Sequence, residues 1–597
     1  MKARVDWQNL RGGGRFTAFL AVIVLGLAAS VTVVAAEKPV AGRIKKPKVL
    51  LIMWDGCRAD AIVNCNVPNL RKLAFGKWQP GYNGAWSFCG KSIHDARGYS
   101  FANHASILNG VTATKHNVYF NHQHARCRVK EWPSFLTRIL DADPRRKACY
   151  LYGCGNASWN LCADERVTHE NFVGEKGIEE CERLAKLYAG PDAPDAAALF
   201  LDYPDDIGHV KGYYPTSPEY IAAVESDDVG LGKVLDAIVA RPTFKSEDWL
   251  IMMTSDHGGC FTMHGWHDTH SQTTPVIVAG KHVVNGQMAG FPRGVDLPVT
   301  ALAHFGIDVS KLNLDGIVIG DKAASWGSAA ALERDLAWYF PMTVKRKYLI
   351  NAVEGGPGTV NIGDEEYFNP NRIASHFAKD KPCLWIGGCA GTPVGAYLED
   401  SVDMFMRPRQ SFSITFWAKT SVVAGEEPCI VANKDMSRPG APGFAITCGD
   451  STERSPAGMC LKFGTPQGMD VKVGTFAVEN GKWSFYAVVF TPEGQAWFYQ
   501  GRSDGKLNWV CERAENALVS SGLPIHLGQD GTGNYYWNYS NLLDDIAVWK
   551  RPLSIAEVKR IFDAGIKEKK QVKALLKGSL KVGSGADFID TTKKAGL

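Results

Sequence analysis

Between Lys48 and about Gly320 the sequence alternates between short apolar runs and longer amphipathic stretches. KVLLIMW, KACYLYG, AALFLDY, DWLIMMT and TTPVIVAG are predominantly apolar, as expected of strands that are buried on both faces. Between two of them, SPEYIAAVESDDVGLGKVLDAIVA keeps its apolar residues at helical spacing. Such alternation predicts an α/β domain over residues 47–320, with a mostly parallel sheet sandwiched by helices.

From about residue 333 the pattern changes to short runs rich in aromatic and β-branched residues. SFSITFWAKT, KWSFYAVVFT, QAWFYQG and DDIAVWK are spaced by Gly, Pro, Asn and Asp, which predicts an antiparallel all-β sandwich over residues 333–565. Near its end, SIAEVKRIFDAG predicts one short helix. We expect residues 566–597, rich in Lys and Gly, to form a solvated basic tail, with a partner-binding basic helix as the alternative.

The first 36 residues have the features of an export signal. Basic residues precede the apolar run FTAFLAVIVLGLAASVTVVAA, which ends in small residues directly before Glu37. This order predicts a cleaved signal peptide over residues 1–36. The alternative is an uncleaved membrane anchor, because an apolar run of about 20 residues can span a bilayer. Both interpretations place the rest of the chain in the periplasm or outside the cell.

Charge and cysteine content limit the partners and the redox chemistry. Sixty-six basic and 62 acidic residues leave a formal charge of +4, which argues against a nucleic-acid-binding surface. Nine of the 15 cysteines precede residue 300 and six follow it. In an exported protein disulfides are expected. The later six could pair among themselves, whereas the earlier nine leave at least one cysteine free or bonded to the other domain; the connectivity stays open.

Three carboxylates follow predicted strands. Asp55 follows KVLLIMW, Asp205 follows AALFLDY, and Asp256 follows DWLIMMT, and the carboxyl ends of such strands meet at one edge of an open sheet. His209 stands one helical turn after Asp205, and His257 is next to Asp256. One Asp at a strand end is more often a cap or turn residue, but this combination of carboxylates and imidazoles predicts a metal centre and suits zinc.

Two further features supply candidate residues. The segment that follows Asp256 contains three more histidines, His264, His267 and His270, and any of them could complete a ligand set. Ser100 stands just ahead of HASILNGV, the start of an amphipathic helix. It has two interpretations, a helix N-cap or a nucleophile whose alkoxide a metal stabilises. The local sequence alone favours the cap.

The order of these blocks resembles the alkaline phosphatase superfamily, whose fold is sulfatase-like, and most closely its type I phosphodiesterase/nucleotide pyrophosphatase branch. The resemblance is carried by MWDGCRAD, SFANHASILNGV, PDDIGH, TSDHGG and MHGW, which occur in that order over about residues 48–280. It implies two Zn²⁺ ions, or another divalent ion in one of the two sites. The nucleophile-side ligands would be Asp55, Ser100, Asp256 and His257, and the leaving-group-side ligands Asp205, His209 and His264.

The same resemblance implies a phosphodiesterase that acts through a phosphoserine on Ser100, with the amide of Asn103 donating to a phosphate oxygen. His264 is preferred to His267 and His270 because its His-Gly matches the family block. Only six residues separate His257 from His264, so a nucleotide-base pocket is not carried over. A phosphomonoesterase, a phosphonate-ester hydrolase and a glycan- or matrix-binding protein with a degenerate hydrolase half stay as alternatives. No nucleic acid is expected beyond a nucleotide substrate.

The sulfatases of this superfamily use a cysteine in Cys-x-Pro-x-Arg, and neither CRADA nor CGKSI has this pattern. The second half resembles the laminin-G-like, concanavalin A-like jelly roll, above all in LLDDIAVWKRPLSIAEVKRIF. That resemblance implies a glycan or extracellular-matrix partner, sometimes with bound Ca²⁺. We expect Trp417, Trp483, Trp497 and Trp549 to pack in the core or on a sheet face rather than to serve as sugar platforms.

Overall fold

The computed structural model describes residues 46–577 apart from 92–97, 173–176, 266–268, 325, 327–329, 343, 346–347, 354–358, 362–367, 370–374, 379–382, 387–394, 399–400, 402–410, 422–426, 453–454, 516, 518, 538 and 540. By its internal contacts the chain divides into Met1–Arg43 and Ile44–Leu597. Because the described residues begin at 46 and end at 577, the expected signal peptide and most of the expected tail lie outside them. Among those described, no helix is long and apolar enough to cross a membrane.

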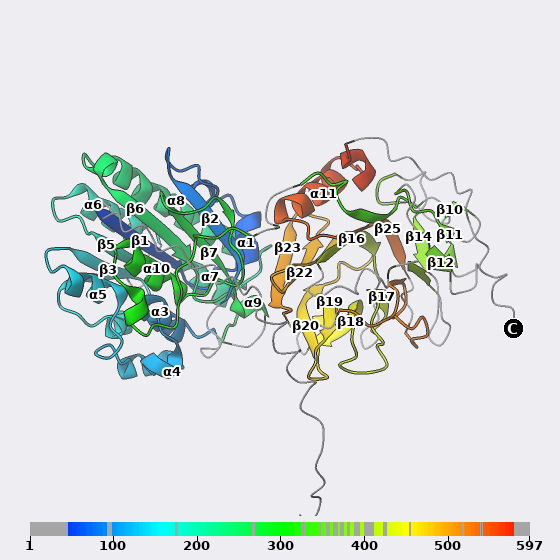
Figure 1. The fold of residues 1–597 in the computed structure, drawn as a ribbon, viewed down its shortest axis with the longest axis horizontal. Coiled ribbons are helices and arrows are strands. Elements are labelled where there is room, and N and C mark those ends of the chain that lie inside the picture. Colours follow the sequence, from blue (N-terminus) through cyan, green and yellow to red (C-terminus); the bar gives the residue numbers. More distant parts are fainter. Residues whose placement is uncertain are drawn as a thin grey trace, which may run out of the picture. The chain divides into compact units, whose positions relative to one another are not determined.

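The first region forms a mixed sheet with helices on both faces (Figure 1). In spatial order its strands are β4 (Val167–Asn171), β3 (Ala148–Tyr152), β5 (Ala196–Leu201), β1 (Pro47–Trp54), β6 (Asp248–Thr254), β7 (Thr273–Gly280), β2 (Asn83–Lys91) and β8 (Gly286–Gln287). β4, β3, β5, β1 and β6 are parallel, whereas β7 is antiparallel to β6 and β2. The predicted mostly parallel sheet is confirmed.

The helices of this region are α1 (Ala59–Asn64), α2 (Pro68–Ala74), α3 (Ser100–Asn109), α4 (Ala113–His116), α5 (Phe135–Ala142), α6 (Ile178–Ala189), α7 (Tyr203–Lys211), α8 (Pro218–Val239), α9 (Thr269–Gln272) and α10 (Asp296–His304). Short 3₁₀ turns lie at Asn121–Arg126, Asn156–Leu161, Phe244–Ser246 and Val309–Lys311. Alternate residues of β1, starting at Leu50, share a core with α2, α6 and α8, and those starting at Val49 share one with α3, α5 and α10. Burial on both faces explains why β1 is predominantly apolar.

The second region consists of antiparallel sheets, which confirms the predicted all-β sandwich. One has the order β12 (Thr359–Asn361), β15 (Ala396–Leu398), β24 (His526–Leu527), β17 (Cys429–Ala432), β18 (Phe444–Thr452), β19 (Ser455–Gly464) and β20 (Asp470–Ala477). The other has β13 (Phe368–Asn369), β14 (Leu384–Ile386), β25 (Leu542–Trp549), β16 (Phe412–Lys419), β21 (Trp483–Phe490), β22 (Gln495–Gly501) and β23 (Leu507–Arg513), with β9 (Leu336–Phe340) also beside β25. β10 (Val344–Lys345) pairs with β11 (Tyr348–Leu349).

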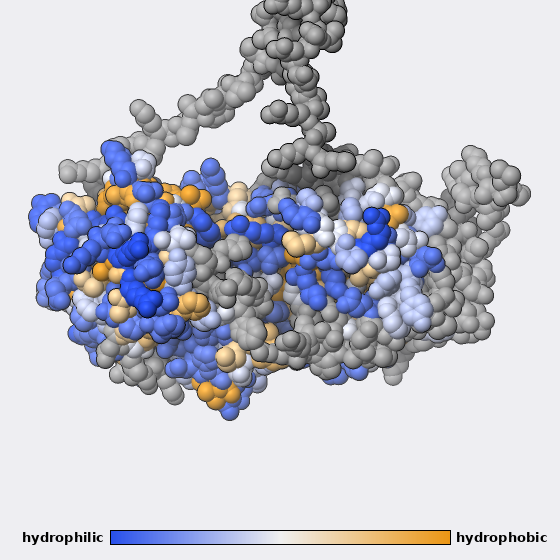
Figure 2. Space-filling model, turned by 90° about the horizontal axis from the view of Figure 1, so that it is seen from below, coloured by the Kyte–Doolittle hydropathy of each residue, from blue (hydrophilic) through white to orange (hydrophobic). Residues whose placement is uncertain are grey.

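The aromatic side chains of this region serve packing. Phe416 and Ile446 belong to the core between the two larger sheets. Trp417, Trp497 and Trp549 are buried on the other face of the β16-containing sheet, as the sequence predicted. On the face of the molecule shown in Figure 2, hydrophilic residues predominate and apolar residues gather only in small groups.

The expected closing helix is α11 (Ile555–Lys567). It begins with a capping box, in which Ser554 and Glu557 satisfy each other's backbone N–H groups. Beyond it, a 3₁₀ turn (Val572–Leu575) packs back onto β25, where the buried carboxylate of Asp545 accepts the Val572 N–H at 3.0 Å.

A disulfide joins the two regions. Cys89 on β2 is bonded to Cys511 on β23, across 422 positions of the sequence. For Cys511, the possibility that the six later cysteines pair among themselves is therefore excluded. The expectation that at least one of the earlier nine is free or bonded to the other domain is confirmed by Cys89. Local sequence could not identify this pair, because the two strands belong to different sheets.

The buried carboxyl of Asp545 on β25 allows a test of how pH affects the stability of the sandwich. Burial and the neighbouring Asp544 raise its pKa to about 7, above a value of about 4 in an unfolded chain. Between these values the folded state binds a proton that the unfolded state lacks, so this group costs stability as pH rises. We expect D545N, which cannot ionise, to gain stability relative to the wild type between about pH 4 and 7, by at most about 1.4 kcal/mol per pH unit.

Denaturant unfolding of both proteins across this pH range measures the difference. D504N, which changes an exposed carboxylate of the same sandwich, is the control and should run parallel to the wild type. A constant difference between D545N and the wild type would contradict the raised pKa of Asp545.

Candidate metal centre and nucleophile

The three carboxylates predicted to meet do meet. Asp55 directly follows β1, Asp205 lies in the first turn of α7 after β5, and Asp256 follows β6. β5, β1 and β6 are neighbours in the sheet, so their carboxyl ends share one edge. Gly56 makes the close approach feasible: its φ of +66° is left-handed, and a Cβ there would collide with the Asp205 carboxylate.

Asp55, Asp256 and His257 form the first donor group. Their ligand atoms lie within 4.8 Å of one another, and all three side chains are buried. His257 donates from Nδ1 to the Gly258 carbonyl at 2.7 Å, which leaves the Nε2 lone pair 3.4 Å from Asp55 Oδ1 and 3.2 Å from Asp256 Oδ2. Within the described part of the chain, those two carboxylate oxygens accept no hydrogen bond. A cation is what such an arrangement of acceptors fits.

Asp205 and His264 form a second donor group together with His257. His264 donates from Nδ1 to the Gly98 carbonyl at 2.9 Å, and its ring stacks on that of His257 with centroids 3.8 Å apart. His209 is one turn from Asp205 on α7, as the spacing predicted, with Nε2 3.3 Å from Asp205 Oδ2. Its Nδ1 donates to the Thr262 carbonyl at 3.0 Å, so both histidines present Nε2 to Asp205.

The electrostatics of this edge favour added positive charge. Burial, and then repulsion by Asp256, raises the pKa of Asp55 well above its usual range. Burial and the neighbouring His257 lower the pKa of His264 to about 4, so its imidazole is neutral and able to bind a metal. The hydrogen bond to Asp205 raises the pKa of His209 to about 9. A divalent cation would relieve the repulsion between the carboxylates.

Ser100 is the first residue of α3, and its side chain is buried. The N-cap is Tyr99, and no side chain caps the helix, so the interpretation of Ser100 as a cap, which the local sequence favoured, is wrong. Instead Ser100 Oγ lies 3.1 Å from His257 Nε2 and donates its proton there. One turn along α3, the Asn103 amide donates to the Tyr99 carbonyl at 3.2 Å. Hydroxyl, imidazole and carboxylates therefore come together as expected.

His104 is a site residue that sequence analysis missed. It is fully buried on α3, and its Nε2 lies 3.0 Å from Asp55 Oδ2 and 3.2 Å from Asp256 Oδ2. The ring therefore hydrogen-bonds to Asp55 and lies beside Asp256, so it constrains both carboxylates. Its position one turn after Ser100 was a usable signal, since residues four apart share a helix face.

Further contacts around the site were also not anticipated. The Tyr213 hydroxyl donates to Asp205 Oδ1 at 2.5 Å, and Arg58 donates to the carbonyls of Tyr213 and Gly259. Arg58 Nη2 also donates to His270 Nδ1 at 2.9 Å. Of the three histidines left open as the last ligand, His264 therefore belongs to a donor group, His270 contacts Arg58, and His267 lies outside the described residues.

Comparison with known proteins identifies the second region. Residues 395–559 match the concanavalin A-like lectin/glucanases superfamily. The described strands of this match form the predicted antiparallel sandwich. No curated protein sequence matches the chain.

Solved structures resemble the first region at low identity. Murine ectonucleotide pyrophosphatase/phosphodiesterase 5 is 13% identical with a TM-score of 0.34, over 44% of this chain and 95% of its own. A 2-O GAG sulfatase is 12% identical with a TM-score of 0.34, over 51% of this chain and 77% of its own. A protein solved with its substrate D-glucosamine-2-N,6-O-disulfate is 12% identical with a TM-score of 0.36, over 53% and 87%. At these TM-scores we draw no functional conclusion from the likeness.

The position of His104 leads to a test of the metal centre. Groups that orient metal ligands typically contribute 10- to 100-fold to metal affinity. We expect H104A to bind Zn²⁺ on the order of 10-fold more weakly than the wild type, because Asp55 and Asp256 lose the donor that orients them. Competition with a chromogenic chelator measures the affinity. H122Q, at an exposed histidine, is the control, and equal affinity in H104A and H122Q would exclude this role.

Proposed function

We propose that the chain is a metal-dependent hydrolase of phosphate esters that uses Ser100 as its nucleophile and two Zn²⁺ ions as cofactors. The observation that carries the proposal is the position of Ser100 Oγ, 3.1 Å from His257 Nε2, beside buried carboxylate oxygens that accept no hydrogen bond in the described structure. A site that only stabilised the fold through a metal would not need a buried hydroxyl at this point.

The donor set fits zinc, since it consists of carboxylates and imidazoles, and binding of a metal would displace the proton that Asp205 favours on His209. Asp55, Asp256, His257 and Ser100 would hold one ion, and Asp205, His209 and His264 the other. When bound, the ions supply positive charge that lowers the pKa of the Ser100 hydroxyl and stabilises the departing oxygen. His104 keeps Asp55 and Asp256 oriented.

The chain's own residues then account for the steps. The Ser100 hydroxyl gives up its proton to solvent, and Ser100 Oγ forms a bond to phosphorus while the bond from phosphorus to the leaving oxygen breaks in line. The leaving oxygen takes up a proton, and the phosphoryl group is left on Ser100. The N-terminus of α3 and the Asn103 amide favour the negative charge on the other phosphate oxygens. Attack of water on phosphorus then breaks the bond to Ser100 Oγ and restores the hydroxyl.

Among phosphate esters we propose a diester substrate, which follows the order of the five sequence blocks from MWDGCRAD to MHGW. Phosphate monoesters and phosphonate esters are the alternatives within the same chemistry. The departure from Cys-x-Pro-x-Arg at Cys57 and Cys89 argues against a formylglycine-dependent sulfatase, and Cys89 is in addition bonded to Cys511.

We also propose a division of roles along the chain. Residues 47–320 would catalyse the reaction. The jelly roll of residues 333–565 would bind a glycan or an extracellular-matrix component, and Ca²⁺ is the ion that could take part in that binding. The disulfide between Cys89 and Cys511 supports an oxidising compartment, in agreement with a signal peptide over residues 1–36.

Turnover of chromogenic esters tests the function. We expect zinc-loaded protein to hydrolyse bis(p-nitrophenyl) phosphate faster than p-nitrophenyl phosphate and not to hydrolyse p-nitrophenyl sulfate. S100A should lose at least about 1,000-fold in kcat, because the nucleophile is removed. S100T keeps a hydroxyl at the same position and should retain turnover.

The outcomes separate the alternatives. A preference for the monoester would keep the mechanism and change the substrate class. Equal rates for S100A and the wild type would refute Ser100 as the nucleophile. Absence of turnover on all three esters by zinc-loaded protein would remove the support for a phosphate-ester hydrolase and favour the glycan- or matrix-binding alternative.

A further inference from the structure

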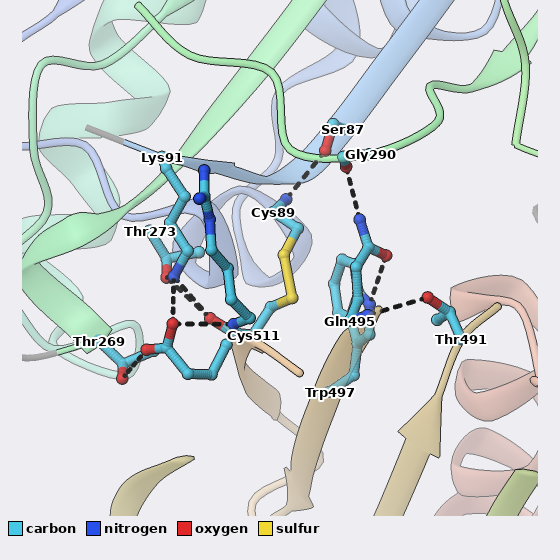
Figure 3. The surroundings of a disulfide bond; sticks show 12 residues. Ser87, Cys89, Lys91, Thr269, Thr273, Gly290, Thr491, Gln495, Trp497 and Cys511 are labelled. Carbon is cyan, nitrogen blue, oxygen red and sulfur yellow. Dashed lines mark hydrogen bonds and ion pairs between the residues drawn. A yellow bond between two sulfur atoms is a disulfide. The ribbon is translucent and has the colours of Figure 1, made fainter. Parts of the chain in front are cut away.

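The edge strand β23 of the sandwich is tied to the hydrolase sheet at more than the disulfide. Cys511 is bonded to Cys89 on β2, and Lys91 at the end of β2 donates to the Cys511 carbonyl at 2.8 Å (Figure 3). Lys91 Nζ also pairs with Glu512 Oε1 at 3.6 Å. Since the Lys91 side chain is buried, this charge needs its partner.

The same strand holds the short helix α9. Thr269 Oγ1 donates to Glu512 Oε2 at 3.0 Å, so the two carboxylate oxygens of Glu512 contact Thr269 and Lys91. The His270 ring meets the Phe476 ring of β20 edge-on, with centroids 6.0 Å apart. α9 is therefore supported by side chains from two strands of the sandwich.

α9 in turn supports the catalytic loop. The Gly258 N–H donates to the Ser271 carbonyl at 2.7 Å, and Gly258 is the residue whose carbonyl accepts from His257 Nδ1. The packing leaves no room for a side chain here, because a Cβ on Gly258 would collide with the His270 carbonyl oxygen. Shifting α9 would therefore shift the carbonyl that orients the His257 ring.

A second route starts from His270. Its Nδ1 accepts from Arg58, which also donates to the carbonyls of Gly259 and Tyr213. The Tyr213 hydroxyl donates to Asp205. The contacts that the sandwich makes with α9, the Thr269–Glu512 hydrogen bond and the His270–Phe476 ring contact, thus lead to both groups of candidate metal ligands.

The contacts of Glu512 with Lys91 and Thr269 favour the ionised form of its carboxylate. Although burial opposes ionisation of Glu512, Lys91 and the hydrogen bonds to its carboxylate hold the pKa of Glu512 below its usual range. The Glu512 carboxylate is an acceptor that can hold Thr269 and Lys91 at the same time.

We propose that the sandwich contributes a positioning residue, Glu512, to the catalytic centre. Glu512 holds α9 in place, and α9 holds the Gly258–His257 turn. The disulfide keeps β23 close enough for this contact. The effect on turnover rests on the proposed function, whereas the effect on the mobility of the loop does not. If the sandwich were only a separable binding module, substitution of Glu512 would change neither turnover nor the mobility of the loop.

Substitution of Glu512 and Thr269 tests the contact. E512A and T269V should each reduce kcat/KM on the order of 10-fold, as the loss of a residue that orients a ligand does, whereas T269S keeps the donor and should restore it. K506Q is the matched control, because Lys506 on the same edge of the sandwich donates to the Thr216 carbonyl, away from α9. Equal kcat/KM in E512A, K506Q and the wild type would overturn the proposal.

A readout that does not depend on turnover keeps the two proposals distinguishable. Hydrogen exchange of the amides of residues 257–265 and 269–273 should be faster in E512A and T269V than in the wild type and K506Q. If the wild type hydrolyses no ester but E512A speeds exchange, the function fails and the positioning role stands. Unchanged exchange in both variants would contradict the role of Glu512 itself.

Reduction of the disulfide tests the tether. A dithiol such as dithiothreitol would transfer two electrons and two protons to the Cys89–Cys511 bond, leaving two cysteine thiols and the cyclic disulfide of dithiothreitol. We expect the reduced protein and the C89S/C511S double variant to show the same faster exchange over residues 257–265 and 269–273. Dithiothreitol should cause no further change in the variant. Far-UV circular dichroism confirms that both are folded. Full protection of the loop in the reduced, folded protein would contradict a role for the tether.

Discussion

The site depends on one electrostatic fact: Asp55 and Asp256 lie side by side, buried, at the edge of the sheet, with oxygens that accept no hydrogen bond in the described structure. Two buried carboxylates this close repel each other, and each must also give up its hydration. His104 compensates on one side and His257 faces them on the other. A bound dication would supply the remaining positive charge, and Ser100 stands where that charge would activate a hydroxyl.

The rest of the structure holds these groups in place. Parallel strands bring the carboxylates to one edge, and the first turns of α3 carry Ser100 and, three and four residues later, Asn103 and His104. The edge strand β23 of the sandwich also contacts the elements around the site, because Glu512 accepts a hydrogen bond from Thr269 of α9. In this account the disulfide between Cys89 and Cys511 fixes a catalytic loop as well as joining two regions of the chain.

The sequence was informative where a local pattern has one physical meaning. Apolar runs predicted the buried strands, and carboxylates at their ends predicted the convergence of Asp55, Asp205 and Asp256. It was insufficient where a residue's role depends on a partner far along the chain. Ser100 has the local features of a helix cap, yet it faces His257, 157 positions away. The pairing of Cys511 with Cys89 and the contact of His270 with Arg58 likewise depend on how separate elements pack.

The metal content of the purified protein tests the central claim most directly. Dialysis against metal-free buffer after loading, followed by elemental analysis, should give two zinc ions per chain for the wild type and fewer for D256N. D256N removes one candidate ligand and also the negative charge that repels the Asp55 carboxylate. Because that repulsion disfavours the folded state, we expect the variant to fold. A folded wild type that retains no zinc, or that retains as much as D256N, would contradict the account of this sheet edge as a metal centre.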